Sequence, residues 1–177
     1  MTDRTWVEFV LGGTRSGKSQ FAEARVEALC TDNRAPMYIA TAEPFDDEMR
    51  TRVDLHQHRR GAHWATIEAP VDLTQAIATQ SRADRVLLVD CLSVWLGNLL
   101  HHNIDIDARM RDLIECVATL PGPVIFVASE VGLGIVPENA LTRRFRDHGG
   151  RLNQAVAHLS CRVTLVVAGQ PLVIKSQ

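Results

Sequence analysis

The chain has 177 residues, of which 46% are hydrophobic and 23% are charged, and its formal net charge is −2. Domains commonly hold about 100–200 residues, so we expect a single domain over residues 1–177. The near-neutral charge argues against a general nucleic-acid-binding surface, and no stretch approaches the ~20 apolar residues that a membrane-spanning helix needs.

Apolar runs alternate with helix-prone segments along the first half of the chain. In order, the sequence predicts a strand at 6–11, a helix at 18–30, a strand at 35–41, a polar helix-prone segment at 46–60, a strand at 63–70 ended by Pro70, and a helix at 71–80.

The second half continues the alternation. It predicts a strand at 85–90, helices at 92–102 and 107–120, a strand at 123–128, a long helix at 138–160, and strands at 162–169 and 172–175. The central strands are apolar on both faces, which favours an α/β fold: a mostly parallel sheet with helices on both sides. A Gly-Gln-Pro turn is too short for a crossover, so the last two strands should form an antiparallel hairpin at an edge.

The most specific local pattern is GGTRSGKS at residues 12–19, which fits G-x-x-x-x-G-K-[ST] between a strand and a helix. In this P-loop pattern Gly12 and Gly17 permit the tight turn, and the backbone N–H groups from Gly13 to Ser16 cradle phosphate oxygens. Lys18 reaches the β- and γ-phosphates, and Ser19 is a candidate Mg²⁺ ligand. The alternative is a glycine-rich turn with a solvated lysine. The pattern predicts nucleotide binding without naming a reaction.

Asp90 closes the apolar strand RVLLVD. In a parallel sheet this end lies at the same edge as the phosphate loop, where a second Mg²⁺ ligand is required. The alternative is that Asp90 caps the helix that starts near Leu92.

Three of the seven histidines lie in RTRVDLHQHRRGAHW. At helical spacing Arg52, His56 and Arg60 form one row, with Arg59 nearby. Adjacent cations disfavour a charged imidazole, so His56 would be a neutral nucleophile, and the arginines would stabilise a phosphate under attack. The alternative is a solvated basic helix.

The segment EVGLGIVPEN at 130–139 is expected to form a structured loop at the carboxyl edge of the sheet, where open α/β folds bind ligands. There Glu130 and Asn139 could contact substrate or metal. The alternative is a turn in which Asn139 or Glu138 merely precedes the long helix.

Five blocks taken together resemble one family, the bifunctional adenosylcobinamide kinase/adenosylcobinamide-phosphate guanylyltransferases of cobalamin biosynthesis. These blocks run in order over nearly the whole chain: GGTRSGKSQFAEA, YIATAEPFDDEMRTRVDLHQHRRGAHWATIEAP, LVDCLSVWLGNLL, SEVGLGIVPENALTRRFRDHGGRLNQAVA and LVVAGQPLVIK. The resemblance implies a single P-loop NTPase-like transferase domain.

The resemblance also implies two reactions. A nucleoside triphosphate, ATP or GTP, phosphorylates the hydroxyl of adenosylcobinamide. A histidine then attacks the α-phosphate of GTP, and the resulting GMP is passed to adenosylcobinamide phosphate. Matching without gaps places this nucleophile at His56. The nucleotide-contacting residues that it implies are Gly12, Gly13, Thr14, Arg15, Ser16, Gly17, Lys18, Ser19, Ala40, Thr41, Ala42, Gln57, His58, Arg59, Arg60, Glu68 and Asp90.

Two other functions remain open on the residues alone. One is a P-loop kinase of another small molecule, which would form no histidine adduct; the other is a recombinase-like nucleotide switch, which would need an interaction segment that is not evident. By analogy with the family we expect a homo-oligomer, a trimer. The scattered cysteines Cys30, Cys91, Cys116 and Cys161 and the lack of a signal-like N-terminus favour a cytoplasmic protein with reduced thiols.

Overall fold

The computed structural model describes residues 5–30, 33–43 and 61–177. Its strands are β1 (Val7–Gly12), β2 (Ala35–Ala40), β3 (Ala65–Glu68), β4 (Arg85–Asp90), β5 (Val124–Ser129), β6 (Arg162–Val167) and β7 (Gln170–Ser176). Its helices are α1 (Lys18–Leu29), α3 (Leu73–Gln80), α4 (Leu92–His101), α5 (Ile106–Val117) and α6 (Ala140–Leu159).

The strands form one seven-stranded sheet in the order β3-β2-β4-β5-β1-β6-β7. Every neighbouring pair is parallel except β6 and β7, which form an antiparallel hairpin at the edge. The predicted fold class is therefore confirmed. Because β1 lies between β5 and β6, the loop that follows it emerges near the middle of the carboxyl edge.

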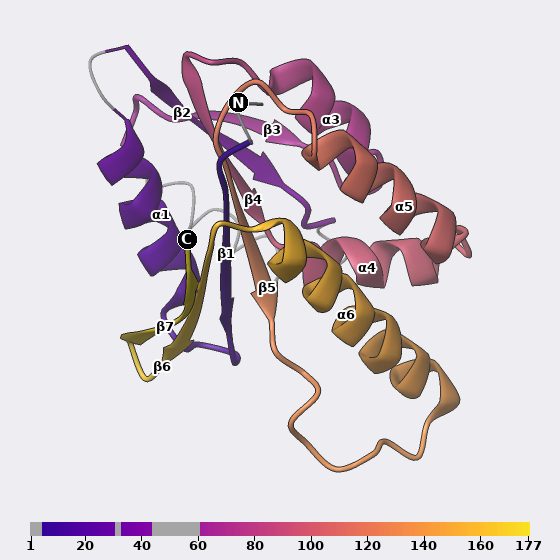
Figure 1. Cartoon of the computed structure of the whole chain (residues 1–177). Helices are drawn as coiled ribbons and strands as arrows, with labels where there is room; N and C mark the ends of the chain where they lie inside the picture. Colours follow the sequence, from indigo (N-terminus) through magenta and orange to yellow (C-terminus); the bar gives the residue numbers. More distant parts are fainter. Residues whose placement is uncertain (1–4, 31–32, 44–60) are drawn as a thin grey trace.

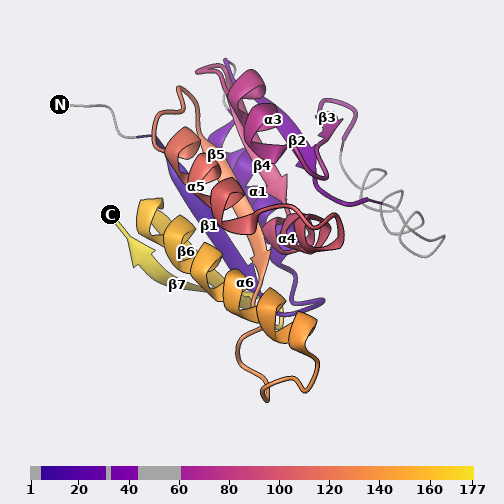
Figure 2. The ribbon, with the colours of Figure 1, turned by 90° about the vertical axis from the view of Figure 1, so that its right-hand side faces the viewer.

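Helices cover both faces of the sheet, with α1 on one side and α3 to α6 on the other (Figure 1; Figure 2). Successive strand residues point to opposite sides: Phe9 and Phe126 join the larger core under α3 to α6, whereas Val10 and Ile125 join the smaller core under α1. All four side chains are at most 1% exposed. This explains why the strands read as continuous apolar runs rather than alternating ones.

Most of the predicted elements are present within a residue or two of their expected bounds, but β3 is shorter than the predicted strand at 63–70. Residues 61–64 instead form a turn in which Trp64 N donates to Gly61 O at 3.1 Å. The Trp64 indole donates to Glu27 of α1 at 2.6 Å, so this turn contacts α1 just before the chain enters the sheet.

The turn between β6 and β7 also differs from the expected Gly-Gln-Pro. Ala168 and Gly169 make the turn, with φ angles of 50° and 77°, as in hairpins whose two central residues both have positive φ. Gln170 and Pro171 already belong to β7, and an edge strand tolerates a proline because one side of its backbone has no partner strand.

Among the described residues, no helix is long and apolar enough to cross a bilayer. All four cysteines are described and none forms a disulfide.

Candidate active site

The phosphate loop connects β1 directly to α1, as the sequence predicts. Gly12 ends the strand where a side chain would not fit: a Cβ there would collide with Ser16 Oγ and lie 2.7 Å from Val166 O. Gly17 has a φ of 93°, a left-handed conformation that glycine adopts without strain, and it occupies the N-cap of α1 without a capping side chain. The first amides of α1 are therefore directed into the loop, an arrangement suited to an anion.

The loop is held from two directions. Within it, Ser16 N donates to Gly13 O at 3.2 Å, and from the β6–β7 turn Gly169 N donates to Ser16 O at 2.8 Å. Lys18 lies over the loop, with its Nζ 3.3 Å from Gly13 O. The hydroxyl of Ser16 is buried and has no hydrogen-bond partner among the described residues. A buried hydroxyl aimed into a glycine loop suits donation to a phosphate oxygen.

A cavity of about 610 Å³ opens beside this loop. It is lined by seven consecutive loop and helix residues, Thr14 to Gln20, together with Cys91, Val94 and Ser129. Ser129 ends β5 and Cys91 follows β4, so the cavity lies at the carboxyl edge of the sheet, where open α/β folds bind ligands. The structure thus places Thr14 to Ser19 of the predicted phosphate loop around one cavity, whereas Gly12, Gly13 and Asp90 are not among its lining residues.

Asp90 ends β4 at the same edge, opposite Ala40 of β2 and Val127 of β5 in the strand register. The Tyr38 hydroxyl donates to its Oδ2 at 3.1 Å and fixes the carboxylate. The capping alternative is wrong, because Cys91 occupies the N-cap of α4 and no side chain caps that helix. A hydroxyl from Ser19 and a carboxylate from Asp90 are the oxygen ligands that Mg²⁺ takes from protein, the rest being water and phosphate, so these residues fit that ion.

Cys91 is the thiol that lines the cavity beside the loop, and its burial determines its protonation state. Burial raises the pKa of the Cys91 thiol to about 12, and the Asp90 carboxylate next to it acts in the same direction. The thiol is therefore protonated at neutral pH and is a poor nucleophile.

The other predicted nucleotide contacts lie where β2 and β3 end. Ala40 and Thr41 are buried, Ala42 is half-buried, and Glu68 is exposed. The hydroxyl of Thr41 donates to Cys91 O and accepts from Cys91 N, both at 2.8 Å. This side chain therefore orders the backbone of the site.

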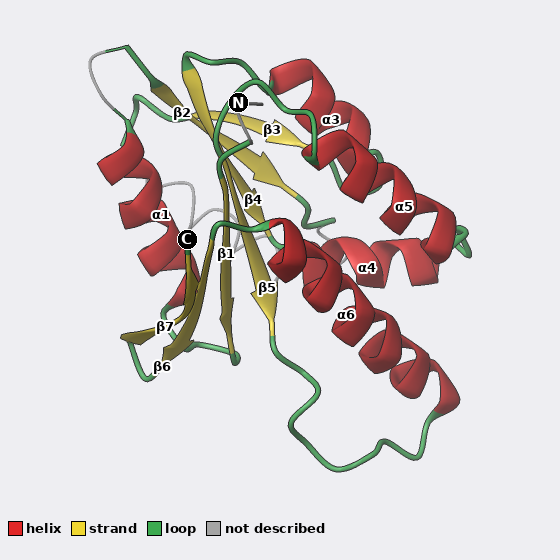
Figure 3. Cartoon of the chain, in the orientation of Figure 1, coloured by secondary structure: helices red, strands yellow, loops and turns green. Residues whose placement is uncertain are grey.

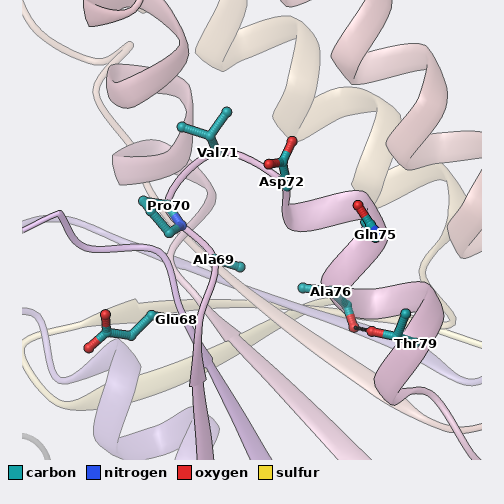
Figure 4. Close-up of a pocket in the computed structure, with 8 residues that line it drawn as sticks. All are labelled: Glu68, Ala69, Pro70, Val71, Asp72, Gln75, Ala76 and Thr79. Carbon is teal, nitrogen blue, oxygen red and sulfur yellow. Dashed lines mark hydrogen bonds between the residues drawn. The ribbon is translucent and has the colours of Figure 1, made fainter.

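A second hollow, of about 360 Å³, begins at Glu68 and continues along α3. It is lined by Glu68, Ala69, Pro70, Val71, Asp72, Gln75, Ala76 and Thr79 (Figure 4). In this view the Glu68 carboxylate points away from Asp72 and Gln75, so these polar groups do not converge on one point.

The predicted residues Arg52, His56, Gln57, His58, Arg59 and Arg60 lie outside the described residues. The chain on either side of residues 44–60 is anchored by a histidine–glutamate contact. His102 Nε2 lies 3.0 Å from Glu43 Oε2, and His63 Nε2 lies 2.9 Å from Glu27 Oε1.

The segment 130–139 forms the predicted loop between β5 and α6, and it extends away from the sheet (Figure 3). Asn139 caps α6, accepting from Thr142 N at 3.1 Å, so the structural alternative for this residue is confirmed. Glu130 accepts from the backbone of Gly132 within the same loop. Leu133 and Ile135 are 88% and 95% exposed, which leaves an apolar tip on the loop.

Comparison with known proteins assigns the family. Residues 8–174 match the family model described as cobinamide kinase / cobinamide phosphate guanyltransferase. The chain belongs to this family. The match includes β1 and the phosphate loop and runs into β7, so it spans the whole sheet.

Relatives of the cobinamide kinase / guanyltransferase family agree over nearly their full length. A bifunctional adenosylcobalamin biosynthesis protein, CobP, from Pseudomonas aeruginosa is 45% identical over 96% of this chain and 98% of its own. The proteins of that description named CobU from Escherichia coli and Salmonella typhimurium are 38% and 39% identical over 94% of this chain and 98% of their own. The family that the sequence blocks resemble is thus confirmed.

A solved structure supports the fold class alone. The flagellar accessory protein FlaH from Methanocaldococcus jannaschii superimposes with a TM-score of 0.53 over 97% of this chain and 79% of its own, at 12% identity.

Sequence reasoning missed three side chains that shape this family member's site: Tyr38, Ser93 and Asn98. Tyr38 holds Asp90, and Ser93 Oγ accepts from Ser129 N at 2.8 Å. The available signal was a polar group inside an otherwise apolar run, as in MYIA and LSVWLGNLL.

Proposed function

We propose that this chain catalyses both reactions of its family: phosphorylation of adenosylcobinamide, and transfer of GMP from GTP to adenosylcobinamide phosphate. The observation that carries the proposal is a complete phosphate loop whose cavity is also lined by Cys91, the residue after Asp90, in a chain matched over residues 8–174 by the family model. Both reactions act on a nucleoside triphosphate, ATP or GTP, and one loop serves both.

For the kinase step, the backbone amides of residues 13–18 and the Lys18 ammonium hold the β- and γ-phosphates. Ser19 and Asp90 would hold Mg²⁺. When bound, that ion neutralises charge on the transferring phosphoryl group. The oxygen of the substrate hydroxyl attacks the γ-phosphorus, a new P–O bond forms, and the bond from that phosphorus to the bridging oxygen of the β-phosphate breaks. The nucleoside diphosphate leaves, and the hydroxyl proton passes to solvent. The chain contributes position and positive charge rather than a nucleophile.

For the guanylyl step, we assign the nucleophile to His56. A ring nitrogen attacks the α-phosphorus of GTP, a P–N bond forms, and pyrophosphate leaves. A phosphate oxygen of adenosylcobinamide phosphate then attacks the same phosphorus, and the P–N bond breaks. The sequence spacing of Arg52, His56 and Arg60 supports this assignment, because flanking cations favour a neutral imidazole.

We assign further nucleotide contacts to Ala40, Thr41 and Ala42, to Gln57, His58, Arg59 and Arg60, and to Glu68. The exposed Glu68 carboxylate at the end of β3 has room to reach a ligand, whereas Thr41 would contribute through the backbone that it orders.

We also infer a cytoplasmic homo-oligomer, a trimer by family resemblance. The support in this structure is β7, an edge strand on which Leu172 and Ile174 are 60% and 58% exposed. Apolar side chains on an open sheet edge favour association.

The test of the function is the intact mass of the protein after incubation with GTP, Mg²⁺ and pyrophosphatase. We expect the mass to rise by one GMP. The His56→Asn variant should gain no GMP and should lose guanylyl transfer, while kinase activity persists in part because phosphoryl transfer uses no protein nucleophile.

Two other histidines provide matched controls. His63→Asn should still form the adduct, because His63 contacts Glu27 on the outside of α1. His58→Asn should also form it, with weaker GTP binding, because His58 is assigned to nucleotide contact and lies outside the Arg52–His56–Arg60 row. An adduct on His56→Asn at the wild-type level would show that another residue is the nucleophile. No adduct on any form would favour a kinase without nucleotidyl transfer.

A further inference from the structure

The loops at the carboxyl edge are joined by one buried amide on α4. Asn98 Nδ2 donates to Thr41 O at 2.8 Å and to Pro70 O at 2.9 Å. Thr41 follows β2 and Pro70 follows β3 by two residues, so a single side chain connects the segments beyond two neighbouring strands. Because both acceptors are carbonyls, the group that faces them must be the NH₂ end of the amide.

Thr41 passes this connection to β4. Its hydroxyl donates to Cys91 O and accepts from Cys91 N, both at 2.8 Å, and its own N–H donates to Asp90 O at 3.3 Å. Thr41, whose carbonyl accepts from Asn98, is therefore hydrogen-bonded to the carbonyl of Asp90 and to both the N–H and the carbonyl of Cys91.

A second side chain of α4, that of Ser93, similarly connects the end of β4 toward β5 and β1. Ser93 Oγ lies 2.8 Å from Ser129 N and 3.3 Å from Ser129 O, at the end of β5. Glu130 N then donates to Gly12 O at 3.1 Å, at the start of the phosphate loop. Together with the covalent step from Cys91 to Ser93, these hydrogen bonds connect the segments at the carboxyl ends of β3, β2, β4, β5 and β1, in the order of the sheet.

Asn98 occupies a buried position of α4 at which an apolar residue would be expected. It is 4% exposed, and its neighbours Trp95, Leu96 and Leu99 are fully buried. A buried amide costs free energy unless it is hydrogen-bonded, and an aliphatic side chain would fill the space without that cost. The Asn98 amide, in contrast, fixes the distance between the segments that follow β2 and β3.

We propose that Asn98 is a positioning residue for nucleotide binding, which acts through Thr41 and Pro70 on Asp90 and Glu68. The proposal rests on the proposed function for the identity of the nucleotide. The amide nitrogen of Asn98 donates to two backbone carbonyls, so the residue acts through the backbone that it joins. It keeps the β3 end, with Glu68, at a fixed distance from the β4 end, with Asp90, so that one nucleotide contacts both.

The test compares Asn98→Ala with Ser160→Ala. Ser160 is 0% exposed and donates to Val156 O at 2.7 Å just before β6, at the opposite edge of the sheet. Both variants should melt at lower temperature than the wild type, because each loses buried hydrogen bonds. At a temperature where all three proteins are folded, we expect calorimetry to give about tenfold weaker GTP binding for Asn98→Ala alone, as for the loss of ~1.4 kcal/mol.

Thr41 provides a second, conservative pair. Thr41→Val removes the hydroxyl and should weaken GTP binding like Asn98→Ala, whereas Thr41→Ser keeps the hydroxyl and should lose less affinity than Thr41→Val. Should Asn98→Ala fail to fold, this pair carries the test. Wild-type affinity in folded Asn98→Ala or Thr41→Val would overturn the proposal, as would an equal loss in Ser160→Ala. The readout needs no catalysis, so it is separate from the GMP adduct that tests the proposed function.

Discussion

At the scale of single residues, Lys18 is the cation that the phosphate loop places beside its own Gly13 carbonyl. Both proposed reactions must neutralise a triphosphate in the same loop. We therefore expect Lys18→Ala to slow kinase and guanylyl transfer alike, by about 10²-fold or more, because a preorganised charge-assisted contact is lost. Rates of both reactions at saturating substrate give the measurement.

The matched control for this change is Lys175→Ala. The Lys175 ammonium donates to the carbonyls of Ala157 and His158 at the end of α6, away from the cavity. This variant should lose some stability and keep both activities. Guanylyl transfer at the wild-type rate in Lys18→Ala would show that the two reactions use separate nucleotide sites.

At the scale of elements, β4 carries Asp90 to the carboxyl edge and Tyr38 of β2 holds its carboxylate. The Asp90→Asn variant should bind GTP without Mg²⁺ about as well as the wild type and gain less affinity when Mg²⁺ is added, because an amide is a weaker ligand than a carboxylate. Calorimetry with and without the ion measures the difference.

Asp112→Asn, on the exposed face of α5, is the control and should leave the gain from Mg²⁺ unchanged. An equal gain in Asp90→Asn and the wild type would exclude Asp90 as a ligand of the ion and return it to a purely structural role.

The elements also show what the sequence could reveal. Continuous apolar runs such as RVLLVD predicted buried parallel strands, and Gly12 to Ser19 predicted the phosphate loop, because both patterns depend on neighbouring residues. The contacts of Tyr38 with Asp90, Thr41 with Cys91 and Asn98 with Thr41 join positions 50 to 57 residues apart. Nothing local marks such pairs, since they form only once the order of the strands is set.

At the scale of the whole molecule, β7 leaves the sheet with an open apolar edge. We expect light scattering to give a mass above the 19.6 kDa of one chain. The double variant Leu172→Lys, Ile174→Lys should shift the mass toward one chain, because charge on an edge strand opposes strand-edge association. Glu115→Lys, at an exposed position of α5, is the control. A wild-type mass of 19.6 kDa would rule out the oligomer.

The β6–β7 turn ties this edge to the phosphate loop: Gly169 N donates to Ser16 O, and a side chain at Gly17 would meet Gly169 at 3.3 Å. If another chain covers β7, assembly and nucleotide binding therefore both affect the contacts of Gly169 with Ser16 and Gly17. Thermodynamic linkage then requires the effect to be reciprocal. If assembly raises the affinity for nucleotide by some factor, bound nucleotide must raise the association constant of the chains by the same factor. A dilution series with and without GTP would measure that factor from either side.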